Sequence, residues 1–211
     1  MAKFTSPFDR CLLAAALVLV GPPAQAYVVG ITAGVRTLFL QVGAGTITGG
    51  NGTFAGGGTP GNNGTINSVS VNVPAAALGA GTQNMTTDSA VTNSSYDGFN
   101  FCAVPAQVYV GGFYRTPGAA ANAILSVTSP ATLSNGTGDT LPFSAISWVS
   151  GGNGDATATI PSGTFTGATQ TIYTANSNNW FESCLAFRYA NTAFAPAGTF
   201  TGRVTYTLTA P

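Results

Sequence analysis

Ionisable side chains are scarce in this chain, and histidine is absent from all 211 residues. Lysine occurs once, as Lys3, and the sequence holds six Lys and Arg residues against six Asp and Glu residues. Proton transfer, nucleophile activation and metal ligation depend mostly on His, Lys, Cys, Asp and Glu. We therefore expect a protein that is not an enzyme and that has no cofactor and no metal site.

Positive charge is too sparse for binding to a nucleic acid. Beyond residue 26 the chain has no lysine, and its only cations are Arg36, Arg115, Arg188 and Arg203. A protein that binds nucleic acid neutralises many phosphates with basic side chains. Nucleic acid is therefore excluded as a partner.

The first 26 residues have the organisation of a secretory signal peptide. Lys3 and Arg10 supply positive charge, a run of ten apolar residues follows, and Ala24-Gln25-Ala26 forms a small-residue cleavage site. The run is shorter than the ~20 residues that span a bilayer, and no later stretch is long and apolar enough. We expect cleavage before Tyr27, no transmembrane anchor afterwards, and a secreted protein of the periplasm, cell surface or medium.

Two cysteines, Cys102 and Cys184, remain after this cleavage. An oxidising compartment permits one disulfide between them, which would close a loop of about 80 residues and contribute roughly 4 to 5 kcal/mol in the chain-entropy treatment. Two buried free thiols are the alternative. A redox-active pair is disfavoured, because neither cysteine lies in a Cys-x-x-Cys motif.

The composition indicates an all-β protein. Glycine, threonine, alanine, serine and asparagine dominate, which favours short strands joined by glycine-rich turns. The best alternation of apolar and polar residues is Thr199–Thr209. Further strand signals lie at residues 68–73, 99–102, 107–113, 123–128, 143–149 and 184–189. The predicted fold is a single β-sandwich domain, immunoglobulin-like or jelly-roll-like.

The chain after the leader is expected to have three parts. Residues 27–42 form an N-terminal strand, residues 43–64 a glycine-rich loop, and residues 65–211 the remainder of the β-sandwich. Segment 43–64 is nearly half glycine and lacks the G-x-x-x-x-G-K-[ST] pattern of a phosphate-binding loop. We therefore interpret it as a connecting loop without a ligand.

Two glycine-rich turns each carry one carboxylate. Asp139 follows Asn-Gly-Thr-Gly, and Asp155 follows Gly-Gly-Asn-Gly, both reminiscent of calcium-binding turns. A calcium site of this kind gathers several carboxylates, whereas each of these turns offers one. We favour ordinary Asx-type turns.

Two other carboxylates lie close to the cysteines in sequence. Asp97 and Glu182 would approach each other if Cys102 and Cys184 were bridged. A pair of carboxylates is the catalytic set of glycoside hydrolases. We favour a structural role instead, with Glu182 paired to Arg188 or Arg115.

Aromatic residues gather around both cysteines, and most are expected in the core. Trp180 follows the polar run 176–179 and is the candidate contact for a ligand, such as a surface glycan. This residue supports the alternative function, a secreted β-sandwich binding module that is carbohydrate-binding.

The segment Pro196–Thr209 resembles the closing strand of the spore coat protein U-like family, which includes the archaic chaperone–usher pilins. A Gly-Thr-Phe entry leads into a strand of alternating Val and Thr residues. The residues that share the apolar face of this strand are Phe200, Val204, Tyr206 and Leu208.

The resemblance implies an exported, incomplete immunoglobulin-like sandwich. Each subunit would be completed by the N-terminal donor strand of the next, giving fibres for adhesion. The residues expected to form such a donor strand are Val29, Ile31, Ala33 and Val35. The leading expectation is thus an exported structural or adhesive protein of the bacterial cell envelope. Its expected partners are other copies of itself, other envelope subunits or surface glycans.

Overall fold

The computed structural model describes residues 28–48, 59–61, 65–192 and 194–211. These residues form an all-β protein in which every strand pairing is antiparallel, and they contain no α-helix. The predicted signal peptide and most of the glycine-rich segment 43–64 lie outside the described residues. In the described part of that segment, β3 (Ile47–Thr48) pairs with β4 (Thr59–Pro60).

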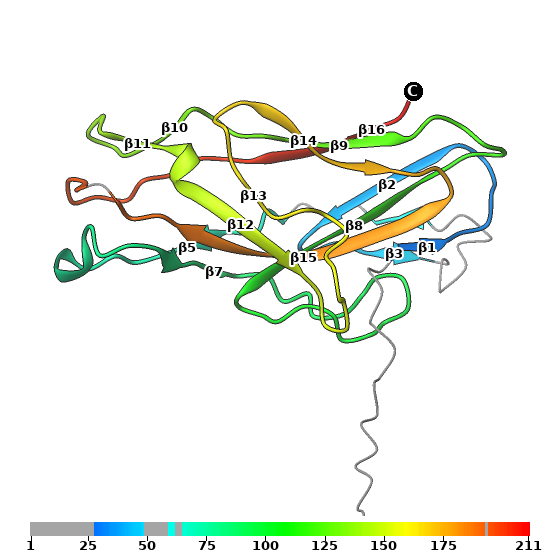
Figure 1. The fold of residues 1–211 in the computed structure, drawn as a ribbon, viewed down its shortest axis with the longest axis horizontal. Helices are drawn as coiled ribbons and strands as arrows, with labels where there is room; N and C mark the ends of the chain where they lie inside the picture. Colours follow the sequence, from blue (N-terminus) through cyan, green and yellow to red (C-terminus); the bar gives the residue numbers. More distant parts are fainter. Residues whose placement is uncertain (1–27, 49–58, 62–64, 193) are drawn as a thin grey trace, which may run out of the picture.

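The largest sheet is built around two long neighbouring strands (Figure 1). Its strand order is β13 (Gly163–Thr164), β12 (Ile146–Gly151), β15 (Asn179–Tyr189), β8 (Gln107–Arg115) and β2 (Thr37–Val42). Two short strands also pair with β15, namely β1 (Val28–Gly30) and β6 (Gln83–Asn84).

A three-stranded sheet lies over one face of the large sheet (Figure 1). Its order is β14 (Thr169–Ala175), β9 (Ala123–Thr128) and β16 (Thr205–Thr209). Two further hairpin-like pairs are β10 (Thr132–Ser134) with β11 (Thr140–Pro142), and β5 (Val69–Ser70) with β7 (Thr86–Thr87). Single 3-10 turns occur at η1 (Ala75–Ala77) and η2 (Phe143–Ala145).

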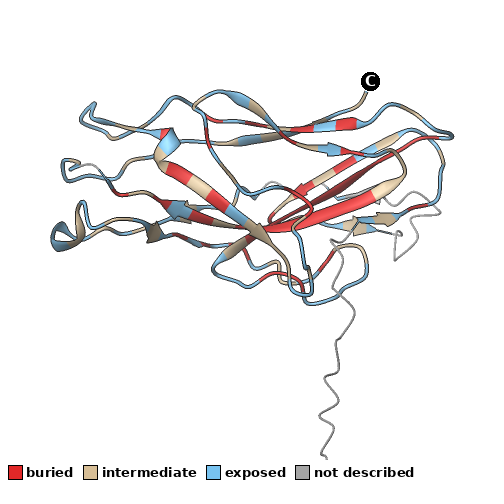
Figure 2. Ribbon diagram, in the orientation of Figure 1, coloured by how far each residue is buried: buried red, intermediate tan, exposed pale blue. Residues whose placement is uncertain are grey.

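The main core lies between these two sheets. Because strand side chains alternate in direction, Leu125 and Val127 of β9 point toward the large sheet, and Phe181, Leu185 and Phe187 of β15 belong to the same buried cluster. Figure 2 shows the resulting burial along β15 and β8. The burial of these apolar side chains is the main driving force that holds the two sheets together.

A second, smaller core covers the opposite face of the large sheet. Phe39 of β2, Phe113 of β8 and Trp180 of β15 contact one another with ring centroids 5.7 to 5.9 Å apart. Phe101 and Cys102 cover this face from a segment that crosses it without forming a strand. The strand predicted at residues 99–102 is therefore wrong, because these residues cap an aromatic cluster and do not extend a sheet.

A disulfide joins the covering segment to β15. Cys102 and Cys184 are bonded with Cα atoms 5.5 Å apart, as predicted, and both are buried. A disulfide indicates an oxidising compartment outside the cytoplasm. The bond fixes residues 99–102 over the β15 face on which the second core lies.

The N-terminal segment forms two strands, whereas one strand was expected over residues 27–42. After β1 the chain turns, because the backbone N–H of Gly34 donates to Thr116 O at 3.3 Å and Arg115 Nε donates to Val35 O at 3.2 Å. These bonds bend the chain around the end of β8 before β2 begins at Thr37.

Candidate functional site

Glu182 is the most unusual side chain in the structure, because it is a carboxylate that is 0% exposed. It lies in the middle of β15 on the face of the second core. Its Oε2 accepts three hydrogen bonds, from Tyr109 Oη at 2.6 Å, Ser94 Oγ at 2.9 Å and Trp180 Nε1 at 2.9 Å. All three donors are neutral groups.

The other oxygen of the same carboxylate has no such partners. Glu182 Oε1 is buried and accepts no hydrogen bond from any described residue. Burial is the largest influence on the pKa of this carboxyl and raises it, while the hydrogen bonds from Tyr109, Trp180 and Ser94 act in the opposite direction. A buried carboxylate with one unsatisfied oxygen is costly unless a cation or another donor reaches it.

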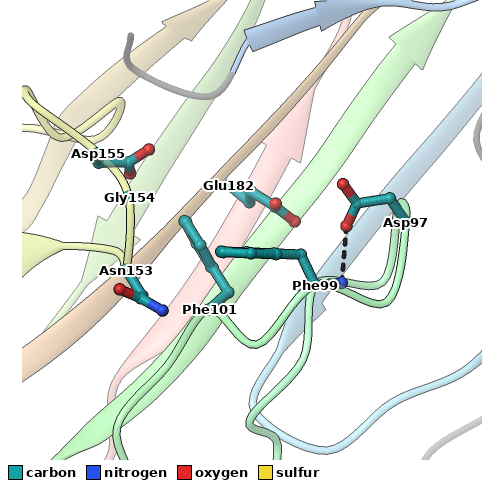
Figure 3. Close-up of a pocket in the computed structure, with 7 residues that line it drawn as sticks. All are labelled: Asp97, Phe99, Phe101, Asn153, Gly154, Asp155 and Glu182. Carbon is teal, nitrogen blue, oxygen red and sulfur yellow. Dashed lines mark hydrogen bonds between the residues drawn. The ribbon is translucent and has the colours of Figure 1, made fainter. Parts of the chain in front are cut away.

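A cavity of about 230 Å³ opens beside this carboxylate (Figure 3). Three carboxylates, two aromatic rings and a short loop line it. The lining residues are Asp97, Phe99, Phe101, Asn153, Gly154, Asp155 and Glu182. Pockets for drug-sized ligands measure roughly 300 to 1,000 Å³, so this cavity fits a small chemical group.

Two loops that are far apart in sequence form the cavity walls. The backbone N–H of Asn153 donates to Phe101 O at 2.8 Å, and Asn153 Nδ2 donates to Asn100 O at 3.0 Å. The Cys102–Cys184 disulfide holds the same wall against β15. On the other side of the opening, Asp97 Oδ1 accepts a 2.9 Å hydrogen bond from the backbone of Phe99, which fixes the carboxylate at the rim (Figure 3).

Metal ligation does not explain the three carboxylates. Within the described residues, no group of three or more His, Cys, Asp or Glu side chains is placed to hold a metal ion. Asp139, which the sequence paired with Asp155 as a calcium-turn candidate, lies in a separate turn. Its Oδ2 accepts hydrogen bonds from Asn135 and Thr137, which lower its pKa, as in an ordinary Asx-type turn.

The structure changes the role assigned to Trp180. This residue was predicted as an exposed ligand contact, but its side chain is 0% exposed and packs between Phe39, Phe113 and Tyr96. Its indole N–H donates a hydrogen bond to Glu182, so Trp180 helps to hold this carboxylate beside the cavity. The prediction of a solvent-facing tryptophan is therefore wrong.

The predicted partners of Glu182 are also different. Neither Arg188 nor Arg115 binds it; Arg115 donates to Val35 O and to Thr37 Oγ1 instead. The expectation that the disulfide brings Asp97 near Glu182 is confirmed, since both line one cavity. Sequence reasoning assigned no role at this site to Ser94, Tyr109 or Asn153. Asn153 lies in the glycine-rich turn before Asp155, whereas Ser94 and Tyr109 lie in no recognisable motif.

The four residues of the expected donor strand do not share one face in this structure. Val29 lies in β1 opposite Trp180, and Ile31 is buried in the second core. Ala33 and Val35 lie after the break in the strand and are exposed. Of the apolar face expected in the C-terminal strand, Val204, Tyr206 and Leu208 pack against the main core, whereas Phe200 precedes β16 and is half-buried.

Comparisons with protein-family models, with curated proteins and with solved structures found no match to this chain. Among the described residues, no helix has the length and apolar character needed to cross a membrane.

Proposed function

We propose that this protein is an exported structural or adhesive protein of the bacterial cell envelope, whose copies associate by exchanging their N-terminal strands. The proposal includes cleavage of residues 1–26 as a signal peptide. It also assigns the two facing sheets to a single β-sandwich domain of immunoglobulin-like or jelly-roll-like type. The C-terminal resemblance to spore coat protein U-like proteins and archaic pilins suggested this mechanism.

One observation carries the proposal. β1 pairs with β15 through only three residue pairs, Val28 to Phe181, Val29 to Trp180 and Gly30 to Asn179. Ile31 follows as a buried anchor in the second core. A short terminal strand with one apolar anchor, placed at an open edge, is the kind of element that two copies exchange without new contacts.

The low charge of the chain supports the same function. The outward face of β16 carries Thr205, Thr207 and Thr209, all exposed, and the sequence has no net charge. Such a surface is polar but repels another copy weakly. Close approach of subunits then costs little electrostatic free energy.

An engineered cysteine pair tests the exchange directly. Gly30 and Asn179 are direct cross-strand partners, so the double variant Gly30→Cys/Asn179→Cys forms a disulfide wherever β1 occupies that edge. We expect covalent oligomers on a non-reducing gel, and fibres by negative-stain microscopy of the wild type. A variant lacking residues 27–36 is the control and should form neither. Cross-linking confined to single chains at high protein concentration would refute strand exchange.

A secreted carbohydrate-binding module is the alternative function. It relied on Trp180 as the exposed contact, and the burial of that side chain removes its basis. Glycan-array binding by the exported protein would restore this alternative. Phe99, which lines the cavity and is 53% exposed, is the aromatic residue to substitute first.

A further inference from the structure

The carboxylate of Glu182 is held in place through one oxygen and presents the other to the cavity. Oε2 accepts hydrogen bonds from Tyr109, Ser94 and Trp180, which fix the orientation of the carboxylate. Oε1 is buried, accepts no hydrogen bond from a described residue, and belongs to a side chain that lines the cavity. A ligand that donates to Oε1 therefore meets a carboxylate that is already oriented, and its binding costs little side-chain entropy.

Two aspartates add negative charge to the same cavity. Asp97 and Asp155 line it from the two loops that form its walls. Figure 3 shows the carboxylates of Asp97 and Glu182 turned toward each other. Burial is the largest cause that raises the pKa of Glu182, and the charge of Asp97 raises it further. A positively charged occupant would relieve this repulsion and favour the ionised carboxylates.

Aromatic rings form the apolar part of the lining. Phe99 and Phe101 both line the cavity, and Phe99 is 53% exposed whereas Phe101 is buried. Gly152 makes room for the buried ring, because a Cβ atom at this position would collide with Phe101 and would lie 2.7 Å from Asp155 Oδ2. The absence of a side chain at residue 152 thus allows an aromatic ring and a carboxylate to share one wall. The face of such a ring attracts organic cations.

These features favour one class of ligand. Within the part of the chain that the structure describes, no group of three or more His, Cys, Asp or Glu side chains is placed to hold a metal ion. A cavity of about 230 Å³ also excludes a large ligand. An aliphatic ammonium group carries several N–H donors, a positive charge and an apolar chain. These three properties match the second oxygen of Glu182, the carboxylates and the aromatic rings.

We propose that this cavity binds an aliphatic ammonium group of another molecule, which donates to Glu182 Oε1 and lies beside Asp97 and Phe99. The group belongs to a free alkylamine or to a lysine side chain of another protein. Beyond residue 26 the chain itself has no lysine. Binding at this site would give an adhesive protein a contact for amine-bearing molecules, and it does not depend on strand exchange.

The two tryptophans of the chain provide a reporter and an internal control. The indole N–H of Trp180 donates to Glu182 Oε2 at 2.9 Å, whereas that of Trp148 donates to Pro161 O at 2.8 Å. A cation at Oε1 changes the charge distribution of the carboxylate to which Trp180 is bonded. In ¹H–¹⁵N spectra at low salt, n-butylammonium should shift the Trp180 indole signal and leave the Trp148 signal unchanged. We expect a dissociation constant on the order of 1 mM for this small probe.

Variants assign the binding to the named side chains. Glu182→Gln removes the charge and should weaken binding by about tenfold or more, as expected for the loss of a hydrogen bond to a charged group. Asp97→Asn keeps the acceptor for the backbone of Phe99 and should weaken binding by about two- to fivefold, and Phe99→Leu by a similar factor. Asp97 and Phe99 are exposed, so their variants test the site even if Glu182→Gln destabilises the fold. Asp139→Asn, in a separate turn, is the matched control and should leave binding unchanged.

Matched probes separate the outcomes. n-Butanol has no charge and tetramethylammonium has no N–H donor, so each should bind about tenfold more weakly than n-butylammonium. Equal binding of either probe would overturn the proposal. The absence of a Trp180 shift would also overturn it, as would an equal shift with sodium or calcium chloride at the same ionic strength, or an affinity that none of the three site variants changes. Nα-acetyl-lysine N-methylamide decides the source: binding equal to that of n-butylammonium supports a lysine side chain, and loss of binding supports a free alkylamine.

Discussion

Tyr109 and Glu182 are diagonal neighbours on the adjacent strands β8 and β15, and the tyrosine hydroxyl donates a 2.6 Å hydrogen bond to the buried carboxylate. Gly111, the residue paired with Glu182 in the ladder, leaves the space that the hydroxyl occupies. Burial is the largest cause that raises the pKa of Tyr109. The negative charge of Glu182 and the hydrogen bond to it raise this pKa further. The two groups thus form one polar unit inside an aromatic core.

Tyr109→Phe removes this hydrogen bond and leaves the rest of the side chain in place. Hydrogen bonds to charged groups contribute about 1.5 to 3 kcal/mol, so we expect a loss of that size in the free energy of unfolding, measured with urea. Tyr114→Phe is the matched control. Its hydroxyl lies buried on the opposite face of the same strand and makes no hydrogen bond to a described residue. Equal losses in both variants would contradict the special role of Tyr109.

The sequence predicted those strands whose own residues show a clear local pattern of apolar and polar positions. Residues 123–128 form β9 with the predicted bounds, and the alternation in the C-terminal segment produces the exposed and half-buried residues of β16. β8 begins at Gln107 as predicted, and its burial on both faces agrees with its nearly continuous apolar sequence. Such patterns reflect the burial of each strand's own residues, which is why they can be read from one segment.

The sequence did not predict the surroundings of Glu182, because its partners lie far apart in the chain. Ser94 is 88 residues away from Glu182 and Tyr109 is 73 residues away, and neither position has a local pattern that marks it. Trp180 follows a polar run, yet Phe39 and Tyr96 cover it from distant segments. The break between β1 and β2 depends on Arg115, which lies about 80 residues further along.

Removal of the disulfide should destabilise the fold without abolishing the strand order. Cys102 and Cys184 close a loop with a sequence separation of 82, and loss of such a bridge costs about 2 to 5 kcal/mol. We expect this loss in the double variant Cys102→Ala/Cys184→Ala, measured by thermal and urea unfolding. A reducing agent should lower the stability of the wild type and leave the double variant unchanged. Non-reducing intact mass of the wild type should lie two hydrogens below that of the reduced chain.

Gly112 is required where β8 passes β2. A Cβ atom at this position would collide with the backbone carbonyl of Phe39, and it would lie 3.3 Å from the ring of Phe181. Gly112→Ala should therefore cost about 1 to 3 kcal/mol, the usual range for overpacking in a core. Gly118→Ala is the control, because a Cβ there meets no heavy atom within 4 Å. Similar urea midpoints for both variants would contradict the close approach of the two strands.

Docking of the N-terminal segment can be measured with two aliphatic residues from the same segment. Ile31 is 7% exposed and packs in the second core, whereas Val35 is 79% exposed. Ile31→Ala should lower the free energy of unfolding by about 2 to 5 kcal/mol, and Val35→Ala should change it by less than about 0.5 kcal/mol. If Ile31→Ala behaves like Val35→Ala, the segment does not hold the position described.

The raised pKa of Glu182 predicts a specific dependence of the protein's stability on pH. Burial lifts the folded pKa above the ordinary 4.5, and the charge of Asp97 adds to this effect. Between 4.5 and the raised value, the native state retains a proton that the unfolded state releases. The free energy of unfolding therefore falls as pH rises through this window.

Urea unfolding of the wild type should show this decline as pH rises above 4.5, and Glu182→Gln should remove it. Asp88 and Asp139 do not mask the effect, because hydrogen bonds lower their pKa values below 3.8 and so confine their titration to more acidic solutions. A decline of equal size in the wild type and in Glu182→Gln would mean that a group other than Glu182 titrates in this window.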